Sequence, residues 1–190
     1  MADSGNVRVG YSGFAYYGAE GVSPPAGPYA EWGVDFTDLG LITEDGLTEA
    51  LDEDRQIFKA WGRNAPVRTQ TTNRTSTFQL TFMETSADTL SLYYAVPLDN
   101  MTSSGSGASQ YIEFDDPDNS EPMYVTLGLD IVDGSHHIRY FIPRAEITDR
   151  GDVVSKNDEI HGYQVTFTAL LPEDGEYSIK RFYGGVELPT

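Results

Sequence analysis

The sequence predicts an all-β fold with one short helix, arranged as a β-sandwich or barrel. Three observations lead to this prediction. Short apolar or alternating segments recur along the chain, turns rich in Gly, Pro and Asp separate them, and only residues 87–95 show helical periodicity. With 190 residues, of which 39% are hydrophobic and 12% aromatic, the chain is large enough for one packed domain rather than a disordered segment.

Charge and composition exclude several kinds of site and partner. The formal net charge is −18, from 30 acidic and 12 basic residues, which argues against a protein that grips nucleic acid through basic patches. The chain has no Cys, so disulfides and thiolate metal sites are excluded. The first residues lack the pattern of a signal peptide, and no apolar run approaches the length of a membrane span. We therefore expect a soluble product that stays where it is made, with no membrane association.

The N-terminal segment, residues 1–30, is expected to be extended and then irregular. Val7, Val9 and Tyr11 share one face of an extended stretch that ends near residue 18. Residues 19–30 are a loop, because three prolines exclude regular structure there: Pro24, Pro25 and Pro28.

An acidic stretch follows at residues 44–54. It begins with the turn Glu44-Asp45-Gly46, since an Asp-Gly pair readily adopts the positive φ angles of a tight turn. The stretch contains no basic residue and ends at Arg55, a pattern typical of a solvated loop. Its acidic members are Glu44, Asp45, Glu49, Asp52, Glu53 and Asp54.

Residues 75–84 have the clearest strand pattern in the chain. Phe78, Leu80 and Phe82 share one face, and the residues between them are polar or Met. Burying these three side chains contributes about 1.5–3 kcal/mol each, which fixes the register of the strand.

The helix at residues 87–95 has a start signal and an apolar face. Ser86 or Thr85 serves as N-cap, and Asp88 lies in the first turn. Leu90, Tyr93 and Tyr94 form one face by helical spacing, and Pro97 ends the helix.

The second half of the chain is read as strands joined by polar turns. We expect a surface loop at residues 100–109, strands at 123–131 and 138–147 around a turn at 132–135, further strands at 159–171 and 177–183, and a C-terminal tail at 184–190. The acidic residues 115–121 do not match the spacing of an EF-hand, so a polar loop is preferred. His136 and His137 point to opposite faces of a strand and cannot chelate one metal together. No metal, cofactor or catalytic residue is expected.

The order of these segments resembles the major tail tube proteins of long-tailed (siphovirus-type) bacteriophages, most closely those of phages that infect actinobacteria. The resemblance rests on Trp32 followed by LGLITEDGLT at residues 39–48, KAWG at 59–62, VRT at 67–69 and TFQLTFME at 77–84. A second block, residues 142–152 and 163–168, has the order of the C-terminal half of that family.

The resemblance implies a structural protein and no enzyme: a single tail tube domain spanning residues 1–190, located in the virion tail and made in the host cytoplasm. Such proteins form hexameric rings that stack helically into a tube between capsid and host. The implied partners are further copies of the chain, a tape measure protein, a tail terminator and distal tail proteins. DNA passes through the lumen without specific binding, and an acidic wall suits that passage. Most basic residues are then expected to point outward or toward neighbouring subunits.

The resemblance also assigns residues 44–64 to a stacking loop that reaches the next ring, while the aromatic residues of the N-terminal segment anchor it to the barrel. In the loop, opposite charges and an aromatic anchor would meet across the ring boundary. For Trp61, burial in the core is favoured over a place at the interface. The expected contact residues are Glu44, Asp45, Glu49, Asp52, Glu53, Asp54, Arg55, Lys59, Trp61 and Arg63.

Three alternatives remain at the level of sequence. The inner tube of a contractile injection system belongs to the same structural class. A carbohydrate- or receptor-binding β-sandwich would use the tyrosines and tryptophans. An acid–base enzyme would need two carboxylates about 5–10 Å apart, which so acidic a chain readily contains by chance.

Overall fold

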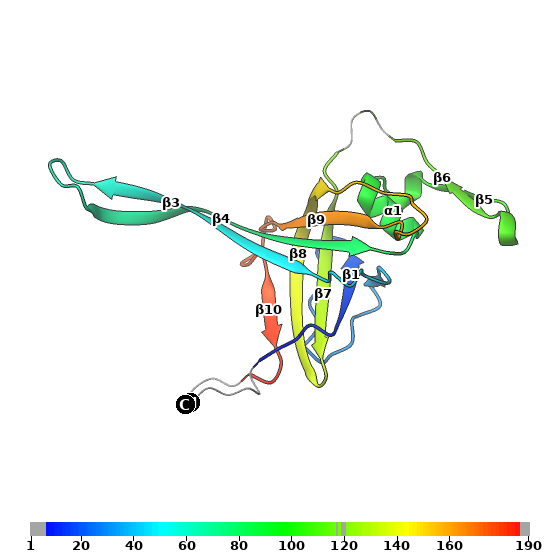
Figure 1. The fold of residues 1–190 in the computed structure, drawn as a ribbon, viewed down its shortest axis with the longest axis horizontal. Coiled ribbons are helices and arrows are strands. Elements are labelled where there is room, and N and C mark those ends of the chain that lie inside the picture. The colour runs from blue at the N-terminus through cyan, green and yellow to red at the C-terminus, as the bar shows by residue number, and fades with distance from the viewer. Residues whose placement is uncertain (1–6, 117, 119–120, 187–190) are drawn as a thin grey trace.

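The computed structural model describes residues 7–116, 118 and 121–186, and its body is one antiparallel sheet from which two hairpins extend (Figure 1). The sheet has eight strands in the order β2-β1-β7-β8-β9-β4-β3, and β10 pairs with β8. β5 and β6 form a separate small hairpin. The all-β class with one short α-helix is confirmed.

In chain order the elements are β1 (Ser12–Gly18), β2 (Thr37–Asp38), β3 (Thr48–Lys59), β4 (Pro66–Phe82), α1 (Ala87–Tyr94), the 3₁₀ turns η2 (Leu98–Asn100) and η3 (Gly107–Ser109) with β5 (Thr102–Ser104) between them, β6 (Tyr111–Glu113), β7 (Tyr124–Asp133), β8 (His136–Arg150), β9 (Tyr163–Ala169) and β10 (Lys180–Tyr183).

Residues 37–43 close the sheet on itself. At one end of this segment, the Leu39 amide donates a hydrogen bond to the Ala15 carbonyl of β1 (2.9 Å). At the other end, the Thr43 amide donates to the Thr81 carbonyl of β4 (3.0 Å). The segment therefore joins β1 to β4, and the sheet encloses the core as a barrel.

The core lies inside this barrel. The alternation predicted for residues 75–84 is confirmed, since Phe78, Leu80 and Phe82 are buried while Gln79 is exposed. β7, β8 and β9 contribute the facing apolar side chains, which alternate with outward-facing residues: Leu127, Leu129, Tyr140, Ile142, Val165 and Phe167.

The helix α1 covers one end of the barrel. The Ser86 hydroxyl accepts a hydrogen bond from the Thr89 amide (3.1 Å), as an N-cap does. The helix ends at Ala95, which has a left-handed conformation, two residues before Pro97. The predicted apolar face is partly wrong. Leu92 is the buried apolar residue, and Tyr94 is 37% exposed, because α1 packs on β8 and β9 along the Leu92 side.

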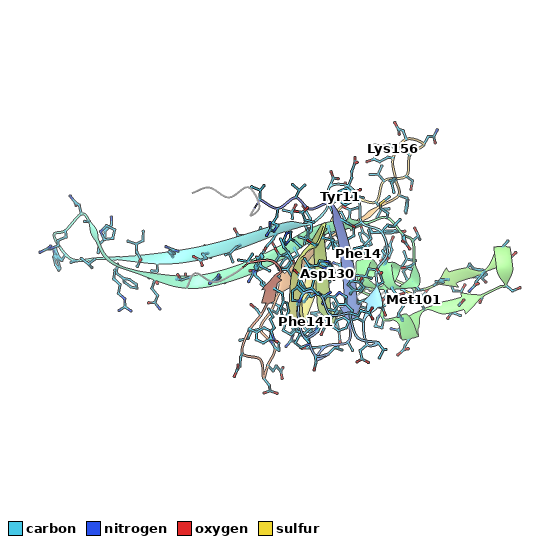
Figure 2. All side chains as sticks on the ribbon, turned by 90° about the horizontal axis from the view of Figure 1, so that it is seen from below. Tyr11, Phe14, Met101, Asp130, Phe141 and Lys156 are labelled. Atoms are coloured by element: carbon cyan, nitrogen blue, oxygen red, sulfur yellow. The ribbon has the colours of Figure 1, made fainter. Side chains whose placement is uncertain are left out.

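The proline-rich loop is held against the outside of the sheet. Trp32 packs on β7 at Gly128, where an added Cβ would lie 2.3 Å from the indole Cη2 atom. The indole nitrogen donates to Asp130 Oδ2 (2.8 Å), and Tyr16 stacks on the same indole. This layer buries the outward-facing side chains of β7 and β8 near their shared hairpin (Figure 2 marks Asp130 and Phe141).

Several segments differ from the sequence expectations. Residues 48–54, read as part of a solvated loop, form strand β3; they are exposed as expected, but they pair with β4. Residues 100–109 contribute η2, β5 and η3 rather than an irregular loop. The strands expected at 159–171 and 177–183 are shorter, as β9 and β10. Part of the acidic 115–121 loop and of the 184–190 tail lies outside the described residues.

Candidate assembly surfaces

A long hairpin projects from the body, and residues 51–74 of it are called the arm (Figure 1). β3 pairs with β4 from Thr48↔Gln79 to Lys59↔Pro66, whereas β9 pairs only with residues 77–82 of β4. Beyond that point no other described strand pairs with either of them. Every residue of the arm is exposed on both faces of the ribbon. The arm therefore has no core of its own, and its side chains are available to another molecule.

Charge is unevenly distributed along the arm. Asp52, Glu53 and Asp54 lie near the body. From residue 55 to residue 83 the chain has five basic residues and no acidic one. The rest of the chain has seven basic and 30 acidic residues, a formal charge of −23. The distal arm is thus a cationic element on an otherwise strongly acidic protein. Its basic residues are Arg55, Lys59, Arg63, Arg68 and Arg74.

Two of these cations are engaged within the arm. Glu53 lies 2.9 Å from Arg55 Nη2 and 3.5 Å from Arg74 Nε. The hydrogen bond from Arg55 holds the pKa of the Glu53 carboxyl below its usual range. Within the described part of the chain, no carboxylate lies within salt-bridge distance of Lys59, Arg63 or Arg68.

The end of the arm is also apolar. Trp61 is 105% exposed, so its expected burial in the core is wrong. The Arg63 amide donates to the Ala60 carbonyl (3.1 Å), which closes the turn that carries this tryptophan. The turn lies far from the barrel (Figure 1), and no described residue covers the indole. Exposed apolar side chains gathered at one place mark interaction surfaces; here they are Ile57, Phe58, Trp61 and Val67.

The structure divides the predicted contact residues among three places. Glu44 and Asp45 lie in a turn on the body, outside the arm. Glu49 lies at the base of the arm, where Arg181 of β10 pairs with it (2.6 Å). The other predicted residues are on the arm: Asp52, Glu53, Asp54, Arg55, Lys59, Trp61 and Arg63.

Sequence reasoning missed the second strand of the arm. On that strand Arg68 and Arg74 complete the charge of the arm and Val67 its apolar end, to which Phe58 of β3 also belongs. The absence of any acidic residue between positions 55 and 83 was the signal that could have found them.

The outer face of β4 and β9 is a second distinctive surface, called the threonine face. Outward-facing residues pair across the strands, as in Thr77↔Thr168 and Gln79↔Thr166, and the Thr148 and Thr168 hydroxyls are 2.7 Å apart. The same face continues onto the arm through two cross-strand pairs that each contain one aspartate, Asp52↔Thr75 and Asp54↔Asn73. Its members are Thr48, Ala50, Asp52, Asp54, Asn73, Thr75, Thr77, Gln79, Thr81, Glu146, Thr148, Asp149, Gln164, Thr166 and Thr168.

All charged members of the threonine face are acidic. Arg144, at its border, lies 3.4 Å from Glu20 and over the ring of Tyr124 at 4.0 Å, so its charge is matched locally. The face is thus neutral and polar at its centre with carboxylates around it.

Within residues 7–116, 118 and 121–186, no group of three or more His, Asp or Glu side chains could hold a metal ion. No described helix is long and apolar enough to cross a bilayer.

Comparison with known proteins gives the family. The family model described as "Phage tail tube protein" matches residues 1–180. No curated protein matches by sequence. Among solved structures, the fold is similar to a chain in the cryo-EM structure of the anti-feeding prophage (AFP) baseplate, 6-fold symmetrised. Identity is 11%, the match covers 88% of this chain and 92% of that chain, and the TM-score is 0.42. The family model covers nearly all of the sequence, and the chain therefore belongs to the phage tail tube proteins and has a structural role in the phage tail.

Proposed function

We propose that this chain forms hexameric rings that stack helically into the tail tube of a long-tailed phage of actinobacteria. The tube conducts DNA from capsid to host, and the chain has no catalytic step. Its partners are copies of itself along the tube, a tape measure protein within it, and terminator and distal tail proteins at its ends. The observation that carries the proposal is the arm, an exposed hairpin with a cationic, apolar end that no other described part of the chain covers.

In this assembly the arm makes the contact between rings. An element that extends beyond its own body reaches a neighbour, and different surfaces meet at each contact, so association is head-to-tail and remains open along the axis. Trp61 supplies the aromatic anchor, because Trp and Arg are enriched among residues that dominate interface energies. The acidic residues near the body keep the base of the arm solvated.

The threonine face lines the channel. Its uncharged hydroxyl and amide groups bind phosphates weakly, and its carboxylates repel them over a Debye length of about 8–10 Å at physiological salt. No Lys or Arg on the face would trap the DNA backbone. A duplex then slides past the wall without specific binding.

Shortening the arm tests the proposed assembly. Removing residues 57–69 and joining Gln56 to Gln70 through an Asn-Gly turn keeps a paired hairpin, since these two residues face each other in the ladder. We expect the wild-type protein to form rings and tubes as its concentration rises, and the shortened protein to stop at rings. Negative-stain microscopy and sedimentation measure this, with the melting temperature as the control for folding.

Two results would count against the proposal. Wild-type protein that stays monomeric at every concentration would exclude self-assembly by this chain. Tubes of normal length from the shortened protein would exclude the arm as the contact between rings. A sheath around the tube in virion micrographs would assign the chain to a contractile machine instead.

A further inference from the structure

A groove on the body is apolar with an acidic rim, which is complementary to the apolar and cationic end of the arm. It runs between residues 10–14 and residues 40–47 and is also lined by residues 129–131, with a volume of about 390 Å³. Three of its apolar side chains are notably exposed: Tyr11 (88%), Leu41 (64%) and Phe14 (40%). Figure 2 labels Tyr11 and Phe14, both on the body and not on the arm. Exposed aromatic and aliphatic side chains around one hollow indicate a docking surface.

The rim of this groove is acidic. Glu44 and Asp45 stand on the turn that borders it. The same turn borders a second cavity of about 730 Å³, lined also by Asp152, Asp158 and Glu159, of which Glu159 is paired with Lys156 (2.8 Å). Among the described residues that line the two cavities, none is basic. A hollow lined by one sign of charge concentrates the field of that sign and attracts an opposite charge.

The end of the arm offers the complementary chemistry. Residues 59–68, called the tip, carry Lys59, Arg63 and Arg68 around the fully exposed Trp61, and no acidic residue. The twelve residues of β3 span roughly 40 Å at about 3.3 Å each. The hairpin end that carries the tip therefore lies far from β1 and the rest of its own body (Figure 1), so a tip that fills this groove comes from a second copy.

We propose that the tip of one copy docks in the groove of a copy in the adjacent ring. Trp61 packs against Tyr11, Phe14 and Leu41, while Lys59 and Arg63 face Glu44 and Asp45. This inference rests on the proposed role of the arm in stacking and adds the surface that receives it. Because tip and groove are different surfaces, each copy donates one and accepts one, and growth continues along the axis.

Engineered cysteines test the contact directly, since the natural chain has no Cys. In the first variant, Ala60→Cys on the tip is combined with Leu41→Cys in the groove. In the control, Ala60→Cys is combined with Leu171→Cys, a residue of similar exposure (60%) outside the groove. Under oxidation of tubes we expect a ladder of covalent multimers from the first variant only. A mixture of copies carrying one cysteine each, Ala60→Cys or Leu41→Cys, should give dimers and nothing larger.

Charge reversal supplies an independent readout. Lys59→Glu with Arg63→Glu should raise the concentration needed for tubes about tenfold or more, as expected for charge pairs at an interface. Adding Glu44→Lys and Asp45→Lys should restore tube growth. The control is Glu173→Lys with Asp174→Lys, because residues 173–175 repeat the Glu-Asp-Gly sequence of residues 44–46 elsewhere on the body. This control should neither block growth nor rescue the tip variant.

The outcomes separate the two proposals. If the shortened arm abolishes tubes but both cysteine variants give no ladder and Glu44→Lys with Asp45→Lys assembles normally, the arm docks elsewhere and this inference is wrong. If the shortened arm leaves tubes intact, the proposed stacking role itself is wrong.

Discussion

At the scale of single residues, the buried pair of Asp130 and Arg139 holds an irregular loop in place. Asp130 is 6% exposed and Arg139 is 3% exposed. Two hydrogen bonds join them, at 2.6 and 2.7 Å. Arg139 Nη1 also donates to the carbonyls of Gly27 and Ala30, and its guanidinium lies over Trp32. These contacts offset the cost of removing both charges from water and fix a loop that has no secondary structure of its own.

Removing one charge of this pair should be strongly destabilising. We expect Asp130→Asn to lower the free energy of unfolding by about 3–5 kcal/mol, because Arg139 is left buried without its counter-charge. Urea unfolding followed by tryptophan fluorescence measures it. The control, Glu20→Gln, breaks the more exposed pair with Arg144 and should cost less than about 1 kcal/mol. Equal effects of the two substitutions would show that the buried pair does not anchor the loop.

At the scale of elements, strands with one buried face could be predicted from the sequence and the arm could not. The strands expected at 75–84, 123–131 and 138–147 correspond to parts of β4, β7 and β8, because a core on one side imposes apolar alternation. The arm is exposed on both sides, so its residues carry no alternation, and its acidic start is typical of a loop. Its strands are held by pairing with each other, which no single segment of sequence reveals.

The candidate surfaces follow the same distinction. Trp61 was expected in the core because large apolar residues usually are buried, but its turn lies beyond any core. The threonine face depends on the registers of β4, β9 and β8, including a shift between Ile147 and Asp149. No short segment of the sequence reveals these strand registers or this shift. Glu44 and Asp45 were grouped with the arm because they are close to it in sequence, although the sheet places them on the body.

A hydrogen bond between β1 and α1 should make the stability of the protein depend on pH in the alkaline range. The Tyr17 hydroxyl donates a hydrogen bond to Asp88 in the first turn of the helix. Burial, together with that bond, raises the pKa of the Tyr17 hydroxyl above its ordinary value of about 10. The folded protein therefore keeps this proton at a pH where the unfolded chain loses it. The stabilisation is complete below pH 10 and is lost as pH rises above it.

Unfolding measured between pH 9 and pH 12 checks this sign. The free energy of unfolding should fall with pH above about 10, and the fall should be less steep in Tyr17→Phe. Tyr11→Phe is the control, because Tyr11 is 88% exposed and should leave the slope unchanged. If Tyr17→Phe keeps the wild-type slope, ionisation of Tyr17 does not limit alkaline stability.

At the scale of the whole molecule, positive and negative charges lie on different parts of the protein. A strongly acidic body carries one cationic element, and that element is the part that extends farthest from it. In the proposed assembly, the acidic bodies repel one another, and contacts in which an arm meets an acidic surface are favoured. The threonine face remains free of cations, which suits a wall that DNA passes rather than binds.

Placing cations on the threonine face tests that role. Thr77→Lys with Thr166→Lys adds two positive charges per copy on neighbouring strands of the face. We expect normal tubes but slower DNA release, because each Lys that contacts a phosphate strengthens binding by releasing counterions. In virions carrying the variant, the fraction that retains DNA after adsorption to host cells should rise and should fall again at higher salt. Thr77→Glu with Thr166→Glu controls for the loss of the hydroxyls, and Leu171→Lys for added charge elsewhere; both should release DNA normally. Normal release by the Lys variant would show that another face lines the channel.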